Sequence, residues 1–256
     1  MTPRVLVVEH EAGAPAGLVG DWLEQAGAVL DVRRPYADGP GVLPGDLAAH
    51  DALLVLGGSM GAHDDADHPW LAPTKELVRE AAATGVPTLG ICLGHQLVAA
   101  ALGGRSAPNP AGQQLGLLAV GWCDAAPQDA LLGPATRAGR GLHWNDDVVL
   151  EVPDAAVVLA RAPGGEVQAA RFAPTVWGVQ LHPEVDEQIV AGWGREDRER
   201  LGDERGAEVA RAVAHARAEL EAGWRPLASR LGELATRPAG RAAQLAAGSR
   251  AWRRTP

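Results

Sequence analysis

The sequence predicts an α/β protein with a mostly parallel, doubly wound sheet and a helical C-terminal extension. Short apolar runs alternate with helix-like sequence through residues 4–102, which is typical of strands and helices that follow each other in a parallel sheet. Glycines flank two of these runs, near residues 57 and 90, where a buried strand turns into a helix. After residue 190 the apolar residues take a helical spacing among many charges, which predicts a helical region.

The first half supplies the parallel sheet in sequence order. We expect strands at 4–8, 28–32, 51–56 and 87–91, with helices at 17–25, 69–84 and 95–102 between or after them. Helices that alternate with strands cover both faces of such a sheet, and the active site lies at the carboxyl ends of the strands.

The second half is rich in strand-like sequence. We expect strands at 115–123, 148–151, 157–160, 167–172 and 176–181. These strands are expected to extend the sheet and to return the chain to its carboxyl edge.

The C-terminal region reads as helices. Charged helical sequence at 195–222 places Val209, Val213, Ala216 and Leu220 on one face. Pro226 is expected to start another helix, with Leu227, Leu231 and Leu234 on its apolar side, and Pro238 to end it. Residues 241–256 carry arginines but no acids and are expected to fray. We therefore divide the chain into a domain at 1–190 and an extension at 191–256, which either caps the sheet or offers a partner or oligomer surface.

Composition narrows the classes of function. The 256 residues include 46% apolar residues, enough for a sizeable core, and the net charge of -9 argues against general nucleic-acid binding. No apolar run approaches the ~18 residues of a membrane span, and residues 1–4 lead directly into the first strand without a signal peptide. Only two cysteines occur, Cys92 and Cys123. We expect a cytoplasmic protein without a membrane association, in which Cys123 packs.

Cys92 is the candidate nucleophile. It lies within Gly-Ile-Cys-Leu-Gly-His-Gln at 90–96, after the strand at 87–91 and before a helix. Such a turn exposes the central side chain, and a helix that starts there favours the reactive thiolate. The alternative is a buried structural cysteine beside packing glycines.

His182 and Glu184 are the candidate base and its partner. They follow the strand at 176–181 in Gly-Val-Gln-Leu-His-Pro-Glu. Residues two apart in an extended chain project to the same side, so Glu184 can reach one imidazole nitrogen while the other faces the sulfur. His95 competes for the role of base, but on the helix after Cys92 it is expected to point away from the attack site.

The two motifs together, GICLGHQL and GVQLHPE, resemble the class I (triad-type) glutamine amidotransferases, and the GMP-synthetase-like members most closely. The resemblance covers about residues 4–190 and implies their flavodoxin-like fold. It implies that Cys92 is the nucleophile, His182 the general base and acid, and Glu184 the residue that orients the histidine. It implies no metal or organic cofactor.

The same resemblance implies further site residues. The backbone N–H groups of Gly58 and Leu93 would form the oxyanion hole. The side chain of Gln96 would hold the amino-acid end of glutamine, and the backbone at Leu115 and Gly116 would contact it. The run 51–56 ends in glycines, which let a backbone amide approach an oxyanion closely; an ordinary strand-to-helix turn is the alternative.

Three stretches need separate comment. Residues 63–68, His-Asp-Asp-Ala-Asp-His, look like metal ligands by composition, but we expect a polar loop before a helix. Asn145 stands where GMP-synthetase-like relatives often carry a histidine. Gln113 and Gln114 stand where a Glu is usual. These two departures bear on specificity or on a partner, and an exposed loop or an edge strand explains them equally well.

The predicted activity is hydrolysis of the glutamine γ-amide through a Cys92 thioester, with ammonia passed to a separate synthase subunit. No Walker-type glycine-rich loop occurs and only about 70 residues follow the motifs, so nothing else here looks able to activate an ammonia acceptor. The alternatives are a stand-alone γ-glutamyl amine hydrolase, a cysteine hydrolase or peptidase on the same fold, and a non-enzymatic module, which would be expected to lack part of the triad. An oligomer is possible.

Overall fold

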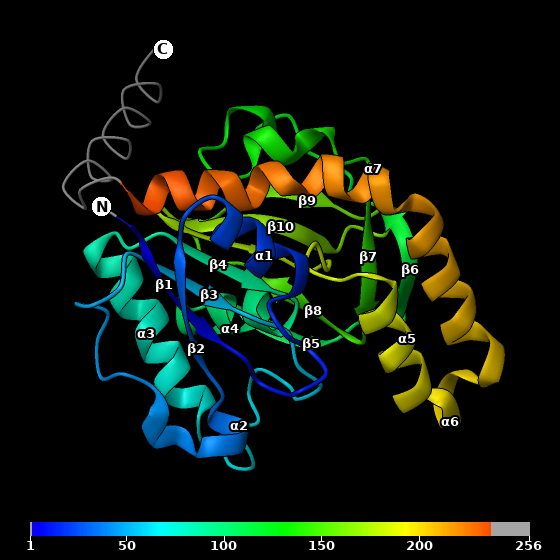
Figure 1. Cartoon of the computed structure of the whole chain (residues 1–256), viewed down its shortest axis with the longest axis horizontal. Helices are drawn as coiled ribbons and strands as arrows, with labels where there is room; N and C mark the ends of the chain where they lie inside the picture. The colour runs from blue at the N-terminus through cyan, green and yellow to red at the C-terminus, as the bar shows by residue number, and fades with distance from the viewer. Residues whose placement is uncertain (1, 237–256) are drawn as a thin grey trace.

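The main sheet has seven strands in the order β2-β1-β3-β4-β11-β10-β9 (Figure 1). The structure, a computed structural model, describes residues 2–236. Five neighbouring strands are parallel, namely β2 (Val29–Arg33), β1 (Arg4–Val8), β3 (Ala52–Val55), β4 (Thr88–Ile91) and β11 (Val176–Val179). β10 (Val167–Ala173) and β9 (Val157–Arg161) continue the sheet in antiparallel pairing. The predicted mostly parallel sheet is confirmed.

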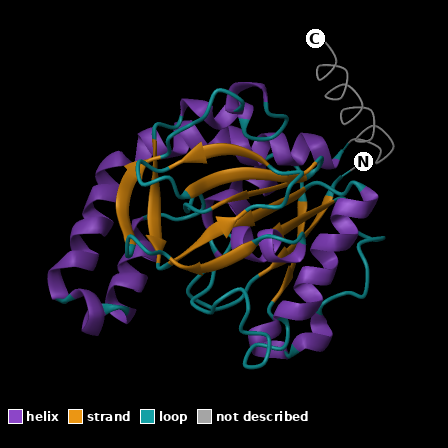
Figure 2. Ribbon diagram, turned by 180° about the vertical axis from the view of Figure 1, so that it is seen from behind, coloured by secondary structure: helices purple, strands orange, loops and turns teal. Residues whose placement is uncertain are grey.

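Helices cover both faces of this sheet, as Figure 2 shows. Alternate residues of β1 face opposite sides, because side chains alternate along a strand. Val5 and Val7 pack with helix α1 (Gly17–Gln25), whereas Leu6 and Val8 pack with α3 (Leu71–Thr84) and α4 (Leu93–Ala101). The short helix α2 (Pro35–Asp38) follows β2. The predicted doubly wound architecture is therefore confirmed.

Two strands of the second half do not extend the main sheet. β6 (Gln114–Ala119) pairs with β7 (Arg140–Asn145), and β8 (Asp147–Glu151) pairs with β5 (Arg105–Pro108), each as a separate two-stranded sheet. The expectation that 148–151 joins the main sheet is wrong, and the expectation for 115–123 holds only at its end. The Arg161 N–H donates to the Gly121 carbonyl at 2.9 Å and the Cys123 N–H to the Leu159 carbonyl at 2.8 Å, so residues 121–123 lie along the outer edge of β9. Residue alternation identifies a strand but not its partner, and β10 and β9 already fill the edge beyond β11.

The C-terminal region differs from the two predicted helices. It forms α5 (Glu187–Glu196), α6 (Arg198–Leu201) and α7 (Asp203–Ala235). The first helix begins earlier than expected because Asp186 caps it, accepting the N–H groups of Gln188 and Ile189. Gly202, with φ 80°, separates α6 from α7.

Pro226 lies inside α7 rather than at a helix start, so that prediction is wrong. It is flanked by Trp224, Leu227 and Leu231. These side chains pack against the α1 face of the sheet, and each residue is at most 1% exposed. Burying such a side chain contributes about 1.5–3 kcal/mol, and together these contacts offset the ~3 kcal/mol cost of an interior proline. Pro238 and residues 241–256 lie outside the described residues. None of the helices in residues 2–236 has the length and apolar content of a membrane span.

Candidate functional site

Cys92 occupies a strained turn between β4 and α4. Its φ of 51° and ψ of -106° make it the one non-glycine residue with positive φ in residues 2–236. Strain of this kind costs about 1–3 kcal/mol and persists only where the surroundings hold it. The Cys92 N–H donates to the Val179 carbonyl at 2.9 Å, and the Gly94 N–H donates to the Leu56 carbonyl at 3.1 Å. Bonds to the ends of two neighbouring strands therefore hold the turn at the carboxyl edge of the sheet.

The glycines beside Cys92 serve close packing. Neither Gly90 nor Gly94 has a positive φ. A Cβ on Gly90 would overlap the Gly94 carbonyl, and one on Gly94 would overlap the Val55 carbonyl. Sequence reasoning assigned these glycines to the sharp turn, but Cys92 itself carries the unusual backbone angles.

His182 is fixed by Glu184 and by the backbone. Its ring Nδ1 lies 2.6 Å from Glu184 Oε1, and its backbone N–H donates to the Leu142 carbonyl at 2.8 Å. Both side chains are almost fully buried, with 5% of His182 and 1% of Glu184 exposed. The Trp193 ring packs edge-on against the imidazole, with centroids 4.7 Å apart. Since Nδ1 is engaged by Glu184, Nε2 is the nitrogen left for the sulfur.

Electrostatics favour the protonated form of His182. Burial by itself would lower its pKa, but the Glu184 carboxylate and the Cys92 sulfur outweigh burial and raise the pKa to about 10. An imidazolium beside a sulfur that can become a thiolate is the resting arrangement expected of a cysteine hydrolase. His95 differs, because burial lowers its pKa to about 3 and its ring packs against Phe172, outside the pocket.

Gly57 lies where Cys92 and His182 converge. A Cβ placed there would be 3.3 Å from His182 Cε1 and 3.8 Å from Cys92 Cβ. We expect Gly57→Ala to push the imidazole by a few tenths of an ångström and to lower kcat by about tenfold to a hundredfold, since small misplacements of catalytic groups are costly. Steady-state kinetics measures the loss, with a thermal melt to show that the fold is kept. Wild-type kcat in Gly57→Ala would contradict this placement.

The two amides expected to form an oxyanion hole belong to residues that adjoin each other. Leu93 begins α4, and its side chain packs against Gly58, since a Cβ on Gly58 would lie 3.0 Å from Leu93 Cδ2. Within residues 2–236, neither the Gly58 nor the Leu93 N–H donates to a protein acceptor. Free N–H groups at a helix start can bind developing negative charge.

Two carboxylates hold the glycine-rich loop that carries Gly58. Glu11 Oε2 accepts the Ser59 N–H at 3.0 Å and the Ser59 hydroxyl at 2.6 Å. Asp64 Oδ2 accepts the Gly61 N–H at 2.7 Å. Asp65, also from the 63–68 segment, pairs with Lys75 at 2.7 Å. These two acids of the segment thus have structural partners, and no cluster of three or more ligand-type side chains with metal-site geometry occurs in the described part of the chain.

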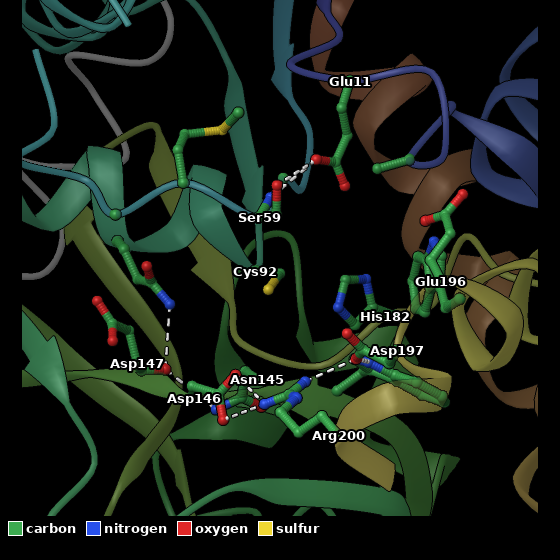
Figure 3. Close-up of a pocket in the computed structure, with 17 residues that line it drawn as sticks. Glu11, Ser59, Cys92, Asn145, Asp146, Asp147, His182, Glu196, Asp197 and Arg200 are labelled. Atoms are coloured by element: carbon green, nitrogen blue, oxygen red, sulfur yellow. Dashed lines mark hydrogen bonds and ion pairs between the residues drawn. The ribbon is translucent and has the colours of Figure 1, made fainter. Parts of the chain in front are cut away.

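A pocket of about 340 Å³ surrounds Cys92 and His182 (Figure 3). Gly58, Gln96 and Asn145, all singled out from the sequence, also line it. Several lining residues were not predicted: Glu11, Trp144, Asp146, Asp147, Trp193 and Arg200. Trp144, Asp146 and Asp147 adjoin Asn145 in the sequence, whereas α5 and α6 carry no motif that would have marked them.

Ion pairs attach the α5–α6 corner to the rest of the pocket. Arg200 contacts both carboxylate oxygens of Asp146, at 2.6 and 2.8 Å, and Asp197 at 2.6 Å. The Trp144 indole N–H donates to Asp197 Oδ2 at 2.8 Å. This part of the C-terminal extension is therefore a wall of the pocket.

Some predicted substrate contacts lie elsewhere. Leu115 and Gly116 pair with Trp144 and His143 in the β6–β7 sheet and do not line the pocket. Gln96 lines it, but its Nε2 already donates to the Asp147 carbonyl and to Gln180. Gln180 lies two residues before His182 in the same motif, and the sequence predicted no role for it. Cys123, expected to pack, is half-buried.

Known proteins of this architecture resemble the chain throughout. The structure of a glutamine amido transferase from Methylobacillus flagellatus superposes with a TM-score of 0.81 at 26% identity, covering 93% of this chain and 97% of that one. A glutamine amidotransferase from Thermotoga maritima gives a TM-score of 0.77 at 21% identity, with 93% and 100% covered. At 21% identity, the similarity to the Thermotoga maritima protein is evidence for the fold alone.

Sequence relatives carry the assignment further. The glutamine amidotransferase-like protein YfeJ of Salmonella typhimurium is 30% identical over 221 residues, which are 84% of this chain and 90% of that protein. A gamma-glutamyl-L-1-hydroxyisopropylamide hydrolase of a Pseudomonas species is 28% identical over 201 residues, 73% of this chain and 64% of the hydrolase. One subunit of the glutamine-hydrolysing GMP synthase of Saccharolobus solfataricus is 34% identical over 145 residues, 55% of this chain and 70% of the synthase subunit. The family model for glutamine amidotransferase class-I matches residues 22–189. The chain therefore belongs to the class I glutamine amidotransferase family and is an amide-hydrolysing enzyme.

Proposed function

We propose that the enzyme hydrolyses the γ-amide of glutamine to glutamate and ammonia through a thioester on Cys92. The observation that carries this proposal is the strained Cys92 turn beside His182, whose other nitrogen lies 2.6 Å from Glu184. All three residues come from the carboxyl edge of the parallel sheet, as β4 and β11 end there.

The chemistry follows from these groups. The Cys92 thiolate adds to the amide carbon, and the N–H groups of Gly58 and Leu93 receive the oxyanion, where losing one donor costs about 2.7–4 kcal/mol. Protonated His182 gives its proton to the departing nitrogen as the C–N bond breaks, and ammonia leaves. Neutral His182 then takes a proton from water, whose oxygen attacks the thioester. The C–S bond breaks, glutamate is released, and the thiolate and imidazolium are restored.

Within this proposal the ammonia passes to a separate synthase subunit. The similarity to the GMP synthase subunit of Saccharolobus solfataricus supports a partner of this kind. The oxyanion loop is held by Glu11 and Asp64, and a docked synthase that alters these bonds would shift the loop between states. We propose that glutamine turnover is slow in the isolated chain for this reason.

A second candidate is hydrolysis of a γ-glutamyl amide whose amine part carries a positive charge. Arg200 is neutralised by Asp146 and Asp197. Three further carboxylates line the pocket without a cationic partner in the described part of the chain: Glu11, Asp147 and Glu196. Burial raises the pKa of Asp147 most, and the nearby acids Asp146 and Asp64 raise it further by repulsion. A cationic substituent would relieve that repulsion.

Steady-state kinetics on the purified chain separates the two candidates. The substrates are glutamine and the γ-glutamyl amides of ethylamine, 1,4-diaminobutane and 4-aminobutyrate. For the ammonia donor we expect weak turnover with glutamine preferred. If partner-free turnover of the diamine amide exceeds that of glutamine, the second candidate replaces the first. In that case Glu196→Gln should lower the preference for the diamine amide over the ethylamide about fivefold, since a charge pair at close range in water contributes ~1 kcal/mol.

A further inference from the structure

Five buried carboxamide side chains, linked at one point by the backbone carbonyl of Asp147, form a chain of hydrogen bonds that ends on the sulfur of Cys92. Each is at most 8% exposed, and two are fully buried. We call them the carboxamide chain, and in order toward the sulfur they are Gln168, Gln114, Asn145, Gln96 and Gln180. They lie on or beside β10, β6, β7, α4 and β11, so the carboxamide chain joins the β6–β7 sheet to the nucleophile.

The contacts nearest the sulfur are direct. Gln180 Nε2 donates to Cys92 Sγ at 3.6 Å, and Gln180 Oε1 accepts from Gln96 Nε2 at 3.3 Å. Gln96 Nε2 also donates to the backbone carbonyl of Asp147 at 3.1 Å, and Asn145 Nδ2 donates to that same oxygen at 3.0 Å. Beyond this point, Gln114 Oε1 accepts from Asn145 at 3.3 Å and from Gln168 at 3.0 Å.

The Asp147 carbonyl decides which way every amide in the chain points. A carbonyl oxygen can only accept, so Gln96 and Asn145 must both turn their NH₂ groups toward it. The second hydrogen of Gln96 then requires the oxygen of Gln180, which turns the NH₂ of Gln180 toward the sulfur. Reversing any one amide would bring two donors or two acceptors together in a buried site, where unmet polar groups are costly.

We propose that Gln180 is a further catalytic residue, which holds the Cys92 sulfur as a thiolate in its attacking orientation, and that Gln96 and Asn145 are positioning residues that set the polarity of Gln180. A thiolate accepts a hydrogen bond more strongly than a thiol does, so a fixed donor favours the charged form. His182 also faces the sulfur, and the carboxylates of Glu11, Asp147 and Glu196 line the same pocket without a cationic partner in the described part of the chain. The inference rests on the proposed function in taking Cys92 as the nucleophile.

Alkylation of Cys92 by iodoacetamide, followed across pH in the full chain, tests the role of Gln180 without using a substrate. Peptide mass analysis scores Cys92 separately from Cys123. Gln180→Met keeps the length of the side chain but removes the donor. We expect the midpoint of its pH profile to move up by about one unit, which lowers the rate about tenfold on the acidic side. Gln128→Met, at an exposed position in the 3-10 segment Ala126–Gln128, is the matched control and should follow the wild-type profile.

Asn145→Asp tests whether a change at Asn145 reaches the Cys92 sulfur through the carboxamide chain. A carboxylate there faces the Asp147 carbonyl and the Gln114 oxygen without a donor, so we expect a smaller upward movement of the same midpoint. An unmoved midpoint would overturn the positioning role of Asn145.

Two results with Gln180 would overturn its role. One is a Gln180→Met profile that coincides with wild type, and the other is a rate lowered equally at every pH. If Gln180→Met does not fold, Gln180→Glu provides the test, since its carboxylate should move the midpoint further up and an unmoved midpoint overturns the inference. Wild-type protein in which a glutamine-derived diazo-ketone leaves Cys92 unmodified would instead contradict the proposed function.

Discussion

Cys92→Ala should abolish glutamate release from glutamine while the protein stays folded. Removing a nucleophile that acts as one unit with its base lowers kcat by on the order of 10⁵ to 10⁶ in comparable enzymes. Alanine keeps the Cβ, and the strain at φ 51° belongs to the backbone. The change therefore removes only the sulfur atom of a residue that is 6% exposed. A glutamate-release assay and a thermal melt measure the two parts of this result.

The identity of the reacting thiol can be checked independently. A glutamine-derived diazo-ketone should add to Cys92 and leave Cys123 unmodified, because only Cys92 lines the pocket among the described cysteines. Retained glutamate release in Cys92→Ala, or an adduct on Cys123, would remove Cys92 from the role of nucleophile.

His182→Ala should remove nearly all activity, and Glu184→Gln should remove less. The imidazole transfers protons in both halves of the reaction, whereas Glu184 orients it through the 2.6 Å contact and stabilises its charge. We expect the loss in Glu184→Gln to be roughly two orders of magnitude smaller. His215→Ala, on the exposed side of α7, is the matched control and should keep wild-type kinetics. Wild-type activity in His182→Ala would show that another group serves as base.

The role of Glu184 also predicts the direction in which the pH profile of kcat moves in Glu184→Gln. Glu184 is the first of the groups that raise the pKa of His182 to about 10, against the effect of burial. The imidazolium must donate a proton to the leaving nitrogen, so wild-type kcat should persist to alkaline pH and decline only as His182 loses its proton. Without the carboxylate the pKa falls, and the alkaline limb should move to lower pH by about one unit or more. An unmoved alkaline limb would contradict this role of Glu184.

The sequence by itself determined the features that depend on short stretches of chain. Apolar runs and helical spacing identified the five parallel strands of the main sheet and α1, α3 and α4, because a buried strand or an amphipathic helix imposes its period on its own residues. The nucleophile turn and the pair His182 and Glu184 were also local. Each lies within a few residues at the end of a strand, where the backbone alone places the side chains.

Only the tertiary structure decided the features that depend on contacts between elements far apart in the sequence. The strand at 115–123 could be recognised, but not its pairing with the unpredicted β7. Pro226 reads as a helix start until the burial of Trp224 and Leu227 is known.

The same holds for the pocket itself. The α5–α6 wall closes through the contact of Arg200 with Asp146, 54 residues earlier, and the carboxamide chain reaches Cys92 through Gln180, 88 residues away. Hydrophobic periodicity reports which face of an element is buried, but not which other element buries it. Contacts of this kind are therefore determined by packing of the whole chain.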